Sequence, residues 1–231
     1  MTPNSTRCAG FPRRKRRAGS PSQMKHRWCG APWTRWHCEV PVMDESIVRG
    51  KKVVLRPKTA DDADDDYRWR ADPELAELDA TAPLRMDFGE FQRHYHDEMR
   101  YPTPWVRRYA IDTLEAKHIG NCMAYDMDTV TGEAEVGIMV GDRKYWGKGY
   151  GREAMALLVD QMFQIAGMRR LYLHTLEWNA RARRAFAGCG FHELRPVRRG
   201  GPNFVLMEMT RDEWMAHRSK VLGDPAQASP E

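Results

Sequence analysis

The chain has 231 residues, of which 42% are hydrophobic and 30% charged, a balance typical of a globular protein with one sizeable core. No apolar run approaches the roughly 20 residues that a membrane-spanning helix needs, so we expect a soluble protein without a membrane partner. Five scattered cysteines, an odd number without a regular framework, argue against a small secreted disulfide scaffold and favour the cytoplasm.

The net charge of +5 is unevenly distributed. Residues 1–42 carry nine Lys and Arg against the single acidic residue Glu39, a net charge of +8, whereas the rest of the chain sums to −3. This segment has no helical or strand periodicity, and we expect a disordered basic extension. Three interpretations remain open: sequence upstream of a functional start at Met43, a solvated tail, or an arm that binds RNA or another polyanion. Its His and Cys residues do not follow zinc-ligand spacing, so no metal site is predicted.

Regular elements begin near residue 51. Residues 52–57 are typical of a strand ended by proline, and Thr59 with Asp62 resembles a capping box at the start of a helix. The acidic run over 61–66 is expected to cap that helix and to remain solvated, where it would suit a cationic acceptor. Aromatic residues at helical spacing predict a second helix over 88–99.

The second part of the pattern predicts the fold class. Three strand-like runs, over 105–112, 118–126 and 133–140, indicate an antiparallel meander. A helix, a strand, a helix and a final strand pair follow, over 152–166, 170–175, 179–187, 191–198 and 204–209. The prediction is an α/β fold in which one mixed sheet combines the meander with a strand–helix–strand unit. One domain is expected over 43–218, with a flexible tail over 219–231.

A glycine-rich loop, Gly147-Lys148-Gly149-Tyr150-Gly151-Arg152, joins a buried strand to a helix. Missing side chains let a ligand reach the backbone amides, which together with the helix N-terminus form a donor array suited to a diphosphate. A nicotinamide site is disfavoured because the loop ends a meander and no acidic residue ends the next strand. A phosphate-transferring P-loop is excluded, since the Gly-Lys-Ser/Thr ending is absent.

With these motifs the chain resembles the GCN5-related N-acetyltransferase (GNAT) family. The cofactor signature of that family, Gln/Arg-x-x-Gly-x-Gly/Ala, is matched by residues 146–151, except that Trp146 replaces the first polar residue. Tryptophan there is similar to the branch that acetylates ribosomal-protein N-termini. A second signature, an Asn followed by a helix ending in Gly-Phe, is matched by Asn179, Phe186 and Gly190-Phe191.

The resemblance implies acetyl-CoA as co-substrate, without a metal, and a primary amine as acceptor, either a peptide N-terminus or a small molecule. A monomer or a homodimer is expected. In the family, the strand before the loop separates from its neighbour, and its backbone pairs with the pantetheine arm. The cofactor-binding residues implied are Met139, Val140, Gly141, Gly147, Lys148, Gly149, Tyr150, Gly151, Arg152, Asn179 and Phe186.

Glu135 is the predicted catalytic base. An amine must be neutral to attack a thioester, and Glu135 stands at a position similar to that of the glutamate base in the histone-acetylating branch. Alternation along the strand predicts its burial. His118, His174 and Asp126 remain alternatives, and the amine is expected to attack directly within a ternary complex. Phe186 replaces the tyrosine that serves as general acid in the family, which leaves a non-catalytic acyl-CoA-binding module open.

Overall fold

The computed structural model describes residues 47–164 and 166–223. All of these lie in the second of two compact units, which spans residues 41–231. The expectations for the basic extension over 1–42 therefore concern residues outside those described.

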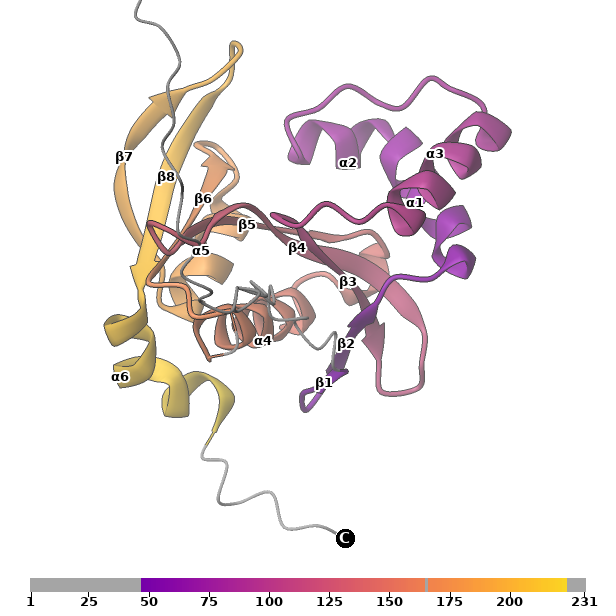
Figure 1. The fold of residues 1–231 in the computed structure, drawn as a ribbon. Helices are drawn as coiled ribbons and strands as arrows, with labels where there is room; N and C mark the ends of the chain where they lie inside the picture. Colours follow the sequence, from indigo (N-terminus) through magenta and orange to yellow (C-terminus); the bar gives the residue numbers. More distant parts are fainter. Residues whose placement is uncertain (1–46, 165, 224–231) are drawn as a thin grey trace, which may run out of the picture. The chain divides into compact units, whose positions relative to one another are not determined.

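One eight-stranded mixed sheet organises the described residues (Figure 1). In spatial order its strands are β1 (Val48–Arg49), β2 (Val53–Pro57), β3 (Arg107–Thr113), β4 (His118–Asp128), β5 (Glu133–Val140), β6 (Arg170–Leu176), β8 (Asn203–Thr210) and β7 (His192–Arg198). Neighbouring strands are antiparallel except β5 and β6, which are parallel and are connected through helix α4 (Tyr150–Gln164). The predicted meander and strand–helix–strand unit are confirmed.

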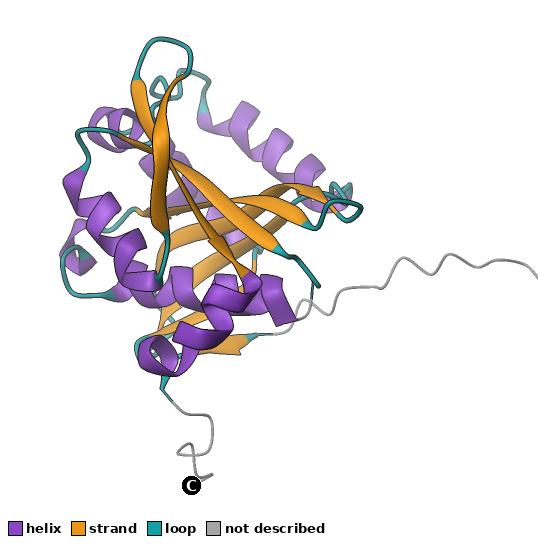
Figure 2. Cartoon of the chain, turned by 90° about the vertical axis from the view of Figure 1, so that its left-hand side faces the viewer, coloured by secondary structure: helices purple, strands orange, loops and turns teal. Residues whose placement is uncertain are grey.

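Helices lie on both faces of the sheet (Figures 1 and 2). On one face are α4, α5 (Ala180–Cys189) and, packed beside α4, α6 (Arg211–Leu222). On the other are α1 (Ala63–Ala71), α2 (Pro73–Leu78) and α3 (Phe88–Arg100), and two single 3-10 turns complete the elements, η1 (Ala60–Asp62) and η2 (Arg143–Tyr145).

The main core lies between the sheet and α4. Alternate residues of β5, such as Ala134 and Val136, are buried against the apolar stripe of α4 that includes Met155 and Leu158. This helix begins at Tyr150, two residues earlier than predicted, so its first turn belongs to the glycine-rich loop itself.

The last helix corrects the predicted domain boundary. A capping box between Thr210 and Glu213 starts α6, and Trp214 anchors it in the core with an exposure of 0%. The indole nitrogen of Trp214 donates to the carboxylate of Asp160 over 2.9 Å. Because the helix continues to Leu222, residues 219–222 belong to the domain and not to a tail.

The acidic run at the start of α1 is only partly solvated. Thr59 and Asp62 form the predicted capping box, in which the backbone N–H of Thr59 donates to Asp62 over 2.7 Å. Asp62 and Asp66, however, are buried and form ion pairs with Arg56 and Lys58. The expectation of a solvated run is therefore wrong for these two carboxylates, which connect α1 to the strand that precedes it.

Among the described residues, no helix is both long enough and apolar enough to cross a bilayer. In the same part of the chain, no three His, Cys, Asp or Glu side chains are grouped so that they could hold a metal ion.

Candidate active site

Strands β5 and β6 separate after a short stretch of pairing. Only residues 133–135 of β5 pair with β6, at residues 170–172. Beyond that point β5 pairs with β4 alone, and β6 pairs with β8 alone. The two parallel strands thus leave a gap in the sheet, as the resemblance implied.

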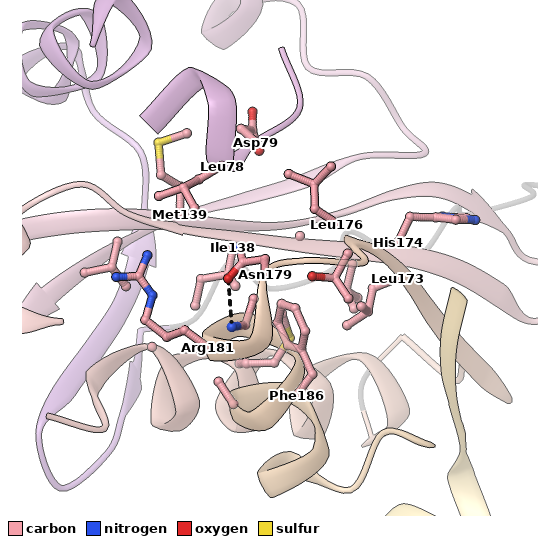
Figure 3. A pocket seen from close by; sticks show the side chains of 18 of the residues that line it. Leu78, Asp79, Ile138, Met139, Leu173, His174, Leu176, Asn179, Arg181 and Phe186 are labelled. Carbon is pink, nitrogen blue, oxygen red and sulfur yellow. Dashed lines mark hydrogen bonds between the residues drawn. The ribbon is translucent and has the colours of Figure 1, made fainter. Parts of the chain in front are cut away.

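A cavity of about 580 Å³ lies at this gap and is lined by residues from both faces of the sheet. Figure 3 shows Leu78 and Asp79 on one face of the sheet, and Arg181 and Phe186 on the other. We call the two parts the α2 end and the α5 end. A molecule filling the cavity would pass through the sheet.

The glycine-rich loop forms one wall of the α5 end. Gly147 and Gly149 have φ values of +71° and +87°, a left-handed conformation that residues with a Cβ rarely adopt. Gly151 lies in the first turn of α4, whose N–H groups have no acceptor within the helix. All three glycines line the cavity. The loop therefore exposes backbone donors at a helix N-terminus, which suits a diphosphate.

Three arginines, Arg152, Arg181 and Arg184, add positive charge at the α5 end. Among the described residues none of them forms an ion pair with a carboxylate. The guanidinium of Arg181 lies 3.8 Å from the ring centroid of Trp146, and the indole N–H of Trp146 donates to the carbonyl of Val140 over 2.6 Å. Trp146 therefore fixes the end of β5 and supports Arg181. Neither Arg181 nor Arg184 is among the predicted cofactor-binding residues.

Met139 and Val140 line the cavity, although the carbonyl oxygen of Val140 is already engaged by that indole. Gly141 does not line it. A Cβ at Gly141 would overlap the indole of Trp69, and its N–H donates to the carbonyl of Ile119 over 2.9 Å. Packing therefore explains this glycine, and its N–H is not free to pair with the pantetheine arm.

Lys148 and Tyr150 are also absent from the residues that line the cavity. The carbonyl of Lys148 accepts a hydrogen bond from Lys52 Nζ over 2.9 Å, and the ring of Tyr150 packs edge-on against Tyr145, with centroids 4.9 Å apart. These contacts hold the loop, and the side chains of Lys148 and Tyr150 take no direct part in the lining.

Glu135 lines the α2 end and is 4% exposed, in agreement with its predicted burial. Its Oε1 lies 2.8 Å from Nδ1 of His174, and its Oε2 lies 3.6 Å from a guanidinium nitrogen of Arg199. Tyr125 stands opposite Glu135 in the register of β4 and β5. Burial, together with the charge of Glu135, raises the pKa of Tyr125, so this phenol stays protonated.

Of the alternative bases, only His174 lines the cavity. His118 lies against Trp69, with ring centroids 4.8 Å apart, and Asp126 is exposed outside the lining. The pairing of Glu135 with His174 was not predicted, and Tyr125 and Arg199 were missed. The contacts of His174 and Tyr125 with Glu135 depend on strand register, and the contact of Arg199 depends on a turn that is distant in sequence.

The helix that follows β6 supplies Asn179 and Phe186, and both line the cavity. The side-chain oxygen of Asn179 accepts from the N–H of Ala182 over 3.1 Å, which confirms its predicted capping role (Figure 3). The ring of Phe186 is 9% exposed and packs edge-on against Phe191. A phenyl ring at this position cannot donate a proton.

Two cysteines are buried, Cys189 in α5 and Cys122 in β4. Burial raises the pKa of the Cys122 thiol, and it raises that of Cys189 to about 12. Both thiols are therefore shielded and protonated, which disfavours either of them as a nucleophile.

A family model described as an acetyltransferase (GNAT) domain matches residues 52–192. The chain belongs to the GNAT acetyltransferase family. This match extends over the sheet from β2 to the start of β7 and includes both signatures named above. The GNAT fold expected from the sequence is therefore confirmed.

The individual relatives share low sequence identity with this chain. The spermidine N(1)-acetyltransferase of Vibrio cholerae is 25% identical over 103 residues, 45% of this chain and 56% of the relative, so the match spans little more than half of that protein. A solved structure of spermidine N-acetyltransferase from Vibrio cholerae with CoA and spermine has a TM-score of 0.64 at 19% identity, over 71% of this chain and 98% of that one. The aminoglycoside acetyltransferase AAC(6')-Ib with coenzyme A has a TM-score of 0.61 at 22% identity, over 72% of this chain and 99% of that one. At these identities the solved structures establish the fold alone.

Proposed function

We propose that this GNAT protein is an acetyl-CoA-dependent N-acetyltransferase whose acceptor is a small primary amine. The observation that carries the proposal is one cavity lined from both faces of the sheet. Its α5 end holds a glycine-rich loop and arginines that form no ion pair within the described residues, and its α2 end holds Glu135 with His174. A cofactor and an amine that enter from opposite faces meet in the gap, where transfer becomes effectively intramolecular.

The α5 end fits the cofactor. The diphosphate would lie on the backbone donors of Gly147, Gly149 and Gly151, with Arg152 and Arg181 supplying positive charge. The unpaired edge of β5 beside Met139 would hold the pantetheine arm. Acetyl-CoA supplies the activated acyl group, and the protein supplies binding and orientation.

The α2 end fits a base. Glu135 accepts a proton from the amine, while His174 holds the carboxylate in place through the contact to Nδ1. The neutral nitrogen then forms the new C–N bond as the C–S bond breaks, and the second proton that the nitrogen loses on becoming an amide passes to solvent. No donor stands at Phe186, so the sulfur departs as the thiolate, which is a good leaving group because free thiols have pKa values near 8.5.

Two observations favour a small amine over a peptide N-terminus. The relatives described above are a spermidine and an aminoglycoside acetyltransferase, both of which act on small amines. The α2 end also carries Asp79, a carboxylate suited to a cation. The acidic run over 61–66 does not line the cavity, so the acceptor contact that its sequence suggested is replaced by Asp79.

The test is a thiol-release assay with acetyl-CoA and a panel of polyamines, aminoglycosides and peptides with free N-termini. We expect amine-dependent CoA release, with an acetylated small amine identified by mass spectrometry. Faster turnover of a peptide than of every small amine would reject the acceptor class. Tight binding of acetyl-CoA without transfer to any amine would identify an acyl-CoA-binding module instead.

A further inference from the structure

A second recess adjoins the α2 end of the cavity. It has a volume of about 300 Å³ and shares Ala80 and Leu176 with the main cavity. Its remaining lining comes from the end of α2, the start of α5 and the turn between β7 and β8: Glu77, Thr81, Trp178 and Pro202. The two spaces therefore adjoin each other across these two residues.

The recess combines an aromatic face with a carboxylate. Trp178 is 58% exposed, and its indole makes no hydrogen bond to a described residue. Glu77 is exposed, and within the described residues its carboxylate forms no ion pair. An aromatic face attracts a cation, and a nearby carboxylate strengthens that attraction. Between these groups, Ala80 and Leu176 offer apolar contacts suited to methylene groups.

Two carboxylates, Glu135 and Asp79, line the cavity on this side. The carboxylate of Asp79 makes no hydrogen bond or ion pair within the described residues; burial raises its pKa, and the charge of Arg70 opposes that rise. The charges of Glu135 and Asp79 both act on the hydroxyl of Tyr125. Arg199, the cation beside Glu135, belongs to an exposed turn that continues into two glycines with positive φ. The two carboxylates at the α2 end can attract an ammonium group, and Arg199 partly offsets their charge.

We propose that this recess is a second cation subsite for the acceptor, and that it binds the distal ammonium group of a linear diamine or polyamine. The face of Trp178 and the carboxylate of Glu77 hold the distal cation, while the terminal primary amine lies beside Glu135. The inference rests on the proposed function, because it concerns the acceptor of that reaction. It also gives a role to the carboxylate of Glu77 and the indole of Trp178, which have no polar partner in the described part of the chain.

The experiment compares 1,6-diaminohexane with hexylamine, which has the same chain and one reactive amine but no distal cation. We expect the wild-type protein to prefer the diamine by about tenfold in kcat/KM. Glu77→Gln and Trp178→Ala should each lower kcat/KM for the diamine by about fivefold, through KM, and leave hexylamine unchanged. Trp178→Phe should retain part of the preference.

Glu115→Gln serves as the control, because Glu115 is an exposed carboxylate in the turn after β3 and lines neither space. Equal losses for both amines, or a wild-type protein without preference for the diamine, would overturn the subsite. Calorimetric titration of the diamine in the presence of CoA measures binding without turnover. Binding that depends on Glu77 and Trp178 without acetyl transfer would refute the proposed function and support the subsite.

Discussion

Three alanine substitutions separate ligand binding at the glycine-rich loop from backbone strain. Gly147 has a φ of +71°, and no atom lies within 4 Å of the position its Cβ would take. Gly167, in the turn before β6, has a φ of +65° and is equally open. Gly151 lies in α4 without a positive φ, and its added Cβ would stand 3.2 Å from Cγ2 of Val140. Gly167 therefore matches Gly147 in strain but not in position.

The expected stability changes follow from these geometries. A left-handed residue with a Cβ costs roughly 1–2 kcal/mol. For a domain of this size each kcal/mol lowers Tm by about 2–4 °C, so Gly147→Ala and Gly167→Ala should each lower it by roughly 2–8 °C. Gly151→Ala gains up to about 1 kcal/mol of helix propensity, and the close contact with Val140 opposes that gain. Its Tm should stay within about 3 °C of the wild type.

The three variants should rank differently in their affinity for acetyl-CoA than in their Tm. Gly147→Ala alters the backbone that presents the donors, and Gly151→Ala adds a methyl group to the cavity wall at the helix N-terminus. Loss of one charge-assisted hydrogen bond costs about 1.5–3 kcal/mol, which corresponds to about tenfold or more in Kd. Isothermal titration calorimetry should show that loss for both variants and wild-type affinity for Gly167→Ala.

Either of two results would contradict the proposed role of the glycine-rich loop. If folded Gly147→Ala and Gly151→Ala bind acetyl-CoA as tightly as the wild type does, the loop does not hold the diphosphate. If Gly167→Ala loses as much affinity as Gly147→Ala, affinity follows general stability and not the local geometry of the loop.

Three further outcomes are expected. Glu135→Gln should lower kcat by about 10²–10⁴-fold while calorimetry finds unchanged affinity for acetyl-CoA, and an activity near that of the wild type would exclude Glu135 as the base. Cys122 and Cys189 should remain unlabelled by iodoacetamide at pH 8 in the native protein, as checked by peptide mass mapping, because burial raises the pKa of both thiols. For Asp62, burial opposes ionisation, but hydrogen bonds from Arg56 and from the backbone lower its pKa from 3.8 to about 2, which stabilises the fold by about 2 kcal/mol above pH 4. Asp62→Asn should therefore be less stable than the wild type in urea at pH 7, by a difference that shrinks as the pH falls from 4 to 2; a constant difference would contradict the assignment.

The fold and the α5 end could be predicted from sequence because their signals are local. Strand β5 was predicted with the bounds observed, since its residues alternate and a Thr-Gly turn precedes it. Asn179 was predicted as a cap because the cap contacts an N–H only three residues away. The glycine-rich loop was identified because its glycines, a strand and a helix are adjacent in the chain.

The α2 end could not be predicted, because its contacts depend on register. Glu135 pairs with Tyr172 across the parallel strands, and this register brings His174, two residues further along, beside the carboxylate. Gly141 was assigned to the cofactor since nothing in its neighbourhood announces Trp69, which covers it from a helix about seventy residues earlier in the chain. The burial of Asp62 likewise requires Arg56 on the neighbouring strand.

The gap between β5 and β6 also separates two electrostatic environments. The α5 end carries guanidinium groups that have no carboxylate partner among the described residues, whereas the α2 end carries Glu135 and Asp79, with Arg199 beside Glu135. Since the sheet lies between them, we expect a phosphate to favour the α5 end and an ammonium group to favour the α2 end. Substitutions in α2 or in the turn between β7 and β8 should therefore change acceptor choice without weakening the cofactor. Within such a fold, acceptors can diversify while the loop and α4 remain as they are.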